Sequence, residues 1–153
     1  MEYLLDNSKQ IRKILLKILD ETPKDLLLEI PKNFNNNIWW NIAHVVVTQQ
    51  LLVYKFSGMP MLVSDEMVEK YKKGTFPDGT ATDEEITQIK ELLFSTLKQT
   101  ELDYNAGNFK SYTPYTTSLN ITLSNVVEAM KFNALHEGIH IGSILALKRN
   151  IGK

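Results

Sequence analysis

The residues of this chain best suited to chemistry are its three histidines, His44, His136 and His140. His136 and His140 are four residues apart, so on a helix they lie about 40° apart around the axis and about 6 Å apart along it. Both imidazoles can therefore reach one ion. His44 belongs to a separate segment with Trp40 and Val47, whose spacing of four and three residues is typical of the buried face of a helix. The spacing thus predicts that two neighbouring helices direct all three histidines into one interior.

Three neutral imidazoles are a suitable ligand set for a transition metal such as zinc, nickel, copper or iron. Three protein ligands leave at least one coordination position open for water or substrate, as in catalytic metal centres. Because the ligands are uncharged, a bound dication would lower the pKa of a bound water toward about 7, or activate a thiol or a carbonyl. The ligand set does not choose among Zn, Ni, Fe and Mn. The alternative is a non-catalytic bundle in which the histidines form a metal-stabilised or simply hydrogen-bonded polar core.

The segment His136 to His140 also satisfies the H-E-x-x-H pattern of zinc peptidases, in which the glutamate is the general base. We disfavour a peptidase because only 13 residues follow His140, so no third ligand follows downstream. Glu137 remains a candidate catalytic residue. The alternatives for Glu137 are a partner of the metal ligands, a substrate contact and a plain surface charge.

Several polar residues are spaced to orient the histidines, because a ligating imidazole usually donates its second N–H to a nearby acceptor. Asn41 lies three residues before His44, Thr48 four residues after it, and Asn133 three residues before His136. The alternative is that these are ordinary polar residues of helices. Three tyrosines are further candidates for the mouth of the site, with packing as the alternative: Tyr54, Tyr112 and Tyr115.

Four proline-free segments are predicted to be the long helices that position these side chains. They cover about residues 3–20, 38–56, 82–104 and 123–150. Short helical turns are expected at about 25–29 and 65–71, and an extended linker at about 108–120. The first helix is predicted to bury one stripe and to leave Arg12 largely off it; the stripe is Leu4, Ser8, Ile11, Leu15 and Ile18. We therefore predict an all-α four-helix bundle, a single domain over residues 1–153, with long connections after the second and third helices.

The last predicted helix carries a second pattern, in which small residues recur every four positions: Ala134, Gly138, Gly142 and Ala146. Each glycine costs about 1 kcal/mol relative to alanine inside a helix, so close packing of another helix on this face would offset that cost. The other helix is either a neighbour in the bundle or the partner in a homodimer.

Composition excludes several classes of function. The chain has no cysteine, which rules out disulfides, iron–sulfur clusters and a thiol nucleophile of its own. Its 17 basic and 18 acidic side chains form no basic stripe, so nucleic acid is not an expected partner. Neither a signal peptide nor an apolar stretch long enough to cross a membrane is evident. We expect a cytoplasmic protein that acts on small molecules.

These motifs resemble those of the DinB/YfiT-like superfamily of metal-dependent enzymes. The resemblance rests on Trp40–His44 (WNIAH), on Phe132–Ile144 (FNALHEGIHIGSI) and on the final KRNIG at 148–152. It implies an up-down-down-up four-helix bundle, often dimeric, that holds a divalent ion with His44, His136 and His140. Relatives include bacillithiol S-transferase and mycothiol-dependent maleylpyruvate isomerase, which use low-molecular-weight thiols. The chain departs from the family at Ser143, where glutamine is frequent.

Overall fold

The computed structural model describes the backbone of residues 2–152 and the side chains of residues 5–152. Its four long helices are α1 (Glu2–Glu21), α3 (Ile38–Val53), α5 (Asp83–Asn105) and α6 (Val126–Lys148). The shorter elements are α2 (Lys24–Leu28), the 3₁₀ helix η1 (Lys55–Ser57), α4 (Asp65–Tyr71) and the strands β1 (Tyr115–Thr116) and β2 (Thr122–Leu123). The prediction of an all-α four-helix bundle is confirmed.

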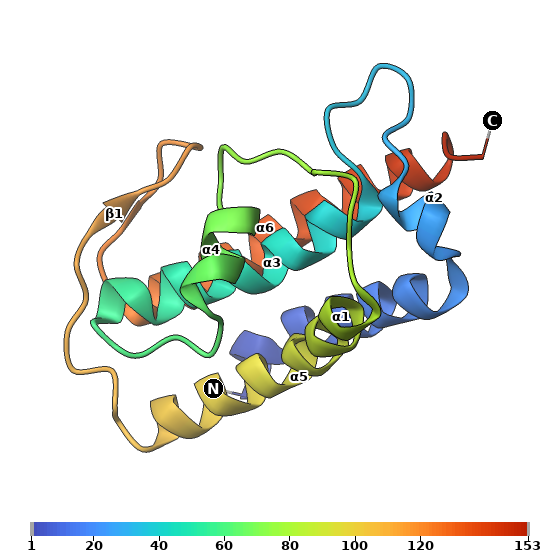
Figure 1. The fold of residues 1–153 in the computed structure, drawn as a ribbon. Helices are drawn as coiled ribbons and strands as arrows, with labels where there is room; N and C mark the ends of the chain where they lie inside the picture. Colours follow the sequence, from blue (N-terminus) through green and yellow to red (C-terminus); the bar gives the residue numbers. More distant parts are fainter. Residues whose placement is uncertain (1, 153) are drawn as a thin grey trace.

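The long helices run in the up-down-down-up order (Figure 1). α1 and α6 point one way, and α3 and α5 point the other way. Each of α1 and α3 packs against both α5 and α6, which closes the bundle around a common core. Because α3 and α5 are parallel, the chain must return along the bundle between them. This return explains the long connection that contains η1 and α4.

Local sequence signals set the helix ends. The Asn37 side chain accepts a hydrogen bond from the backbone N–H of Trp40 at 2.8 Å and caps α3. Thr82 and Glu85 form the capping box expected at the start of α5. The second predicted helix ends earlier than expected, at Val53, because the chain tightens into η1 and then turns at Gly58, whose φ is +68°.

α3 is the central helix, because α2, α4, α5 and α6 all pack on it. Most of its residues are buried, on all sides of the helix. The main core therefore surrounds α3, with Leu15, Leu93 and Ile144 contributed by the other three long helices. His44 lies inside this core, on a helix that neighbours hold from several directions.

The predicted extended linker forms a small hairpin in which Tyr115 pairs with Leu123. The hairpin packs near the end of α3 and the start of α6, where Leu52, Leu123 and Ala129 form a separate apolar cluster. The ring of Tyr115 stacks on Phe56, with 4.5 Å between ring centroids. The hairpin thus lies beside the end of α3 and the start of α6 (Figure 1).

On the helix faces, the expectation about Arg12 needs correction, and the structure bears on the two alternatives left open for the small residues of α6. In α1, Ser8, Leu15 and Ile18 are buried as predicted, and the Leu4 side chain lies outside the described residues. Arg12 is not off the buried stripe, because its side chain is fully buried. In α6, Gly138 and Gly142 are exposed, and no described atom lies within 4 Å of the position of an added Cβ at either glycine. Among the residues that the structure describes, none packs against these two glycines of the small-residue face.

None of the helices that the structure describes combines the length and the apolar character needed to cross a membrane.

Candidate metal centre

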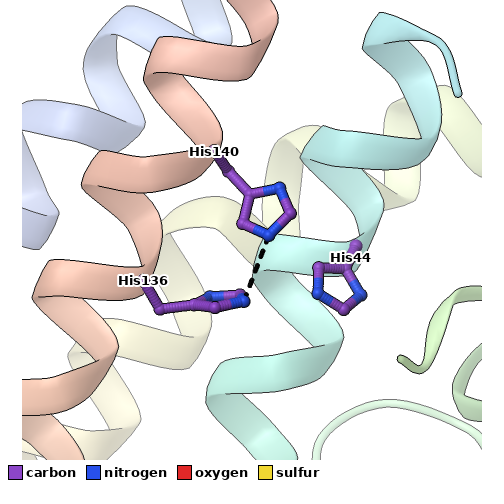
Figure 2. A group of neighbouring side chains, drawn as sticks. All are labelled: His44, His136 and His140. Carbon is purple, nitrogen blue, oxygen red and sulfur yellow. Dashed lines mark hydrogen bonds between the residues drawn. The ribbon is translucent and has the colours of Figure 1, made fainter. Parts of the chain in front are cut away.

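The structure brings the three histidines together. His44 projects from α3, and His136 and His140 project from α6, which packs directly against it (Figure 2). One ring nitrogen from each histidine lies within 4.8 Å of the other two. Figure 2 shows the three rings turned toward a common point between the two helices. This is the arrangement that the spacing predicted.

Hydrogen bonds fix the orientation of two of the three rings. His44 Nδ1 lies 2.7 Å from the backbone carbonyl oxygen of Tyr71 at the end of α4. His140 Nδ1 lies 2.7 Å from Asn41 Oδ1. A carbonyl oxygen can only accept, so each Nδ1 carries the proton and each Nε2 of a neutral ring keeps its lone pair. The Asn41 amide is oriented in turn, because its Nδ2 donates to the Asn37 backbone oxygen at 2.7 Å.

The third ring completes the convergence. His136 Nε2 lies 3.1 Å from His140 Nε2, and this contact is drawn in Figure 2. His136 Nδ1 is buried and has no hydrogen-bond partner in the structure. Because the His140 proton is on Nδ1, His136 Nε2 is the donor in this contact, and a cation held between these nitrogens and the His44 ring would take the place of that proton. The donor set therefore fits a divalent metal ion.

Burial keeps the three histidines neutral at physiological pH. Burial, together with the neighbouring His140 and His44, lowers the pKa of His136 to about 3. Burial and the proximity of His44 lower the pKa of His140 to about 4. The pKa of His44 is also lowered by burial, against the opposing effect of the hydrogen bond that it donates to the Tyr71 carbonyl. Neutral imidazole is the form that binds metals.

The predicted orienting residues have roles that differ in part from those expected. Thr48 Oγ1 lies 3.2 Å from His44 Nε2, so it contacts His44 as its spacing suggested, but at the metal-facing nitrogen and not as the acceptor of the second N–H. Asn41 contacts His140 across the helix pair rather than the nearby His44. Trp40 supports His44 from behind, with its ring stacked at 4.6 Å between centroids.

Glu137 forms a buried ion pair with Arg12, and Asn133 hydrogen-bonds to the same carboxylate. Arg12 Nε and Nη2 both donate to Glu137 Oε1, at 3.0 and 2.8 Å. Asn133 Nδ2 donates to the same oxygen at 2.8 Å, so Asn133 does not contact His136 in this structure. Both charged side chains are fully buried, and the surface-charge interpretation of Glu137 is wrong.

This placement removes the support for a peptidase. Glu137 does not line the cavity beside the histidines, and three donors already occupy one of its oxygens. A general base must lie within hydrogen-bond reach of the water or proton that it abstracts. The H-E-x-x-H pattern therefore reflects one helix with two faces, one directed at the ion site and one at Arg12.

The three histidines form part of the wall of a cavity of about 380 Å³. Much of the remaining wall is apolar and comes from the end of α3, from η1 and from the first half of α6, including Leu52, Phe56 and Phe132. Of the three candidate tyrosines, only Tyr115 lines this cavity. Tyr54 instead donates its hydroxyl to Asp103 at 2.8 Å, and Tyr112 donates to the Leu52 carbonyl at 3.0 Å.

Comparison with known protein families identifies the family to which this chain belongs. The sequence model of the DinB superfamily matches residues 8–144, which include all three histidines and extend from α1 into α6. A search among curated proteins finds no match. Since the family model covers most of the chain, this protein belongs to the DinB superfamily.

Proposed function

We propose that this protein is a divalent-metal-dependent enzyme in which His44, His136 and His140 hold the ion. The observation that carries this proposal is the convergence of three neutral imidazoles at the wall of a cavity. In two of them an oxygen acceptor on Nδ1 leaves the Nε2 lone pair for a metal. A site of only three protein ligands on an open cavity is suited to catalysis rather than to structural support.

The chain's own contribution is orientation and shelter. When bound, a zinc, nickel, iron or manganese ion would supply Lewis acidity that lowers the pKa of a bound water or thiol. The Tyr71 carbonyl and Asn41 hold their imidazoles before the ion arrives, which reduces the ordering that binding requires. The apolar wall around Phe132 limits the water that competes for the site.

The reaction we propose is an S-transfer or hydrolysis of a small electrophilic molecule. The chain has no cysteine, so the nucleophilic sulfur must come from a low-molecular-weight thiol cosubstrate. The thiol releases its proton, its sulfur forms a bond to the electrophilic carbon, and the leaving group departs with the electron pair of the bond that breaks. Water takes the place of the thiol in hydrolysis. Membership of the DinB superfamily supports this class of chemistry.

We also propose that Asn133 orients His136 when the ion is bound. Asn133 Oδ1 and His136 Nδ1 are both buried and both lack a hydrogen-bond partner. They are three residues apart on one helix, and one can accept where the other can donate. The Asn133 Nδ2 bond to Glu137 keeps the amide in the orientation that offers Oδ1 as the acceptor.

A homodimer through the outer face of α6 is the assembly that we propose. Gly138 and Gly142 lie open on this face, and apolar side chains are exposed beside them: Leu135, Ile139 and Leu145. Small residues four apart permit close helix approach, and burial of the apolar side chains would favour it.

The activity is tested with a chromogenic electrophile, 1-chloro-2,4-dinitrobenzene, and a panel of small thiols. Chloride departs as the thioether forms, so product absorbance reports S-transfer directly. We expect turnover that requires added metal and that falls to background in His44→Ala. A protein that binds one ion per chain yet transfers neither thiol nor water to this and related electrophiles would favour a non-catalytic metal-binding bundle.

A further inference from the structure

The charge distribution around the histidine cavity is one-sided. Two lysines line it, Lys55 from η1 and Lys73 from the turn after α4, while no aspartate or glutamate does. This asymmetry occurs in a chain whose acidic and basic side chains are nearly equal in number, 18 and 17. Since the histidines are neutral, the ammonium groups of these two exposed lysines are the charged groups of the cavity wall among the described residues.

Neither lysine is neutralised by a neighbour in the part of the chain that the structure describes. Lys55 and Lys73 form no ion pair there. The lysines next to Lys73 differ, because Lys70 pairs with Glu85 at 2.8 Å and Lys72 pairs with Glu69. Lys73 therefore differs from Lys70 and Lys72 in two ways: it lines the cavity, and its charge is free to interact with a ligand.

The rest of the wall includes aromatic side chains against which an apolar group can pack. Phe56 and Phe132 line the cavity, and Phe56 is held in place by its stack on Tyr115. The volume of about 380 Å³ is within the range of small-molecule sites. The cavity therefore offers cationic groups, apolar walls and three inward histidines.

We propose that the substrate is an amphipathic organic acid, with its acidic group held by Lys55 and Lys73 and its apolar or aromatic body against Phe56 and Phe132. Only one part of this inference rests on the proposed function: that the reacting end of the substrate lies at the histidines. An ammonium is a point charge without the planar fork of arginine, so carboxylate and phosphate are both suitable acidic groups. The two lysines are then the residues that determine specificity.

The test is calorimetric binding of three probes that share an aromatic body: 4-phenylbutyrate, phenyl phosphate and the uncharged 4-phenylbutanol. We expect at least one acid to bind more tightly than the alcohol, and its affinity to fall about 3- to 10-fold in Lys55→Met and in Lys73→Met. Lys98→Met, an exposed lysine on α5 away from the cavity, is the matched control and should bind as the wild type does. Added salt should weaken acid binding and leave alcohol binding unchanged.

The two acids separate a carboxylate from a phosphate preference. The titrations are run on the protein as purified and again after chelation, with helicity checked, so that direct coordination to a metal is distinguished from the lysine contacts. Metal content is measured separately for every variant. Lysine-dependent acid binding in a protein that takes up no ion would leave this inference standing and overturn the metalloenzyme.

Three results would overturn the inference itself. They are equal affinity for acid and alcohol, acid binding that survives in the Lys55→Met/Lys73→Met double variant, and no acid binding at 10-fold above the expected millimolar range of such small ligands. Any of them in a protein that still binds one ion per chain would leave the metal site intact and place substrate selection elsewhere.

Discussion

At the scale of single side chains, the three histidines differ in what their Nδ1 atoms contact. His44 is held by a backbone carbonyl and His140 by the Asn41 side chain. His136 Nδ1 has no partner in the structure, although Asn133 Oδ1 is buried and equally unpaired. Removal of either asparagine should therefore loosen a ligand rather than remove one.

We expect Asn41→Leu and Asn133→Leu each to weaken metal binding by about 10- to 100-fold, because the loss of a partner that orients a ligand has this effect. Competition with a chromogenic chelator measures the affinity. Asn108→Leu is the control, since Asn108 donates to Asp103 outside the site and should leave metal affinity unchanged. Wild-type affinity in Asn133→Leu, with the fold retained, would show that His136 needs no partner from Asn133.

The pKa values of the histidines predict how acid affects the metal-free protein. The pKa of His136 is lowered by burial to about 3 and that of His140 to about 4, against about 6.5 in an unfolded chain. The unfolded state therefore binds more protons between these values, so the free energy of unfolding should be maximal above about pH 6.5 and decrease as the pH falls toward 4.

Urea denaturation in the presence of chelator at a series of pH values measures this dependence. His136→Gln should show a shallower decrease, because it removes one of the titrating groups. A wild-type denaturation midpoint that stays constant from pH 7 to pH 4.5 would contradict the neutral, buried state of these side chains.

At the scale of elements, the Arg12–Glu137 pair joins α1, α5 and α6. Arg12 Nη1 donates to Thr96 Oγ1 at 2.7 Å and to the Leu93 carbonyl at 3.0 Å, while its other nitrogens hold Glu137. All of these contacts are buried. The ion pair thus fixes how α6 is rotated against its neighbours, and with it the direction in which His136 and His140 point.

Arg12→Met should reduce the free energy of unfolding by about 3–5 kcal/mol, because it leaves a buried carboxylate without its counter-charge. Urea denaturation at neutral pH measures the loss. Lys17→Met is the control: Lys17 pairs with Glu21 on the surface of the same helix, and its removal should change stability by at most about 0.5 kcal/mol. The double variant Arg12→Met/Glu137→Leu should be more stable than Arg12→Met alone. A double variant less stable than Arg12→Met would show that the unpaired Glu137 carboxylate is not the cause of the loss in Arg12→Met.

The elements also show where sequence reasoning succeeds. Capping residues and apolar spacing predicted all four long helices and the short α4. The burial of Arg12 was missed, although Leu5, Ser8, Arg12, Leu15 and Leu19 repeat at three and four residues and are all buried. A charged residue within an apolar helical stripe is normally assigned to the exposed edge of that stripe, because an unpaired charge inside a core is prohibitively costly. Only the contact with Glu137, 125 positions away in sequence, resolves that cost.

At the scale of the whole molecule, packing decides contacts that spacing leaves open. The spacing along the chain predicted that Asn41 contacts His44. The packing of α3 on α6 instead places Asn41 Oδ1 at hydrogen-bond distance from His140 Nδ1. The cavity brings together residues from η1, the turn after α4, the hairpin and α6, which no local pattern connects. The outer face of α6, by contrast, is readable from the sequence as a stripe of small residues. The structure adds that no neighbour within residues 2–152 covers it.

That face carries the prediction about assembly. We expect the wild type to be dimeric and Gly142→Leu to weaken or abolish the dimer, because a leucine at this position would hold the two helices apart. Light scattering after gel filtration measures the mass. Ser95→Leu, an equally large change at an exposed position of α5, is the matched control and should remain dimeric. A folded Gly142→Leu variant with unchanged dimer mass would exclude this face as the interface.

The central claim is the three-histidine metal site, and elemental analysis tests it most directly. Untagged protein purified without chelator is compared with His44→Ala, His136→Ala and His140→Ala, with helicity measured for each. We expect about one divalent ion per chain in the wild type and its loss in all three variants while helicity persists. A wild type that holds no ion, even after zinc, nickel, iron or manganese is added, would contradict it.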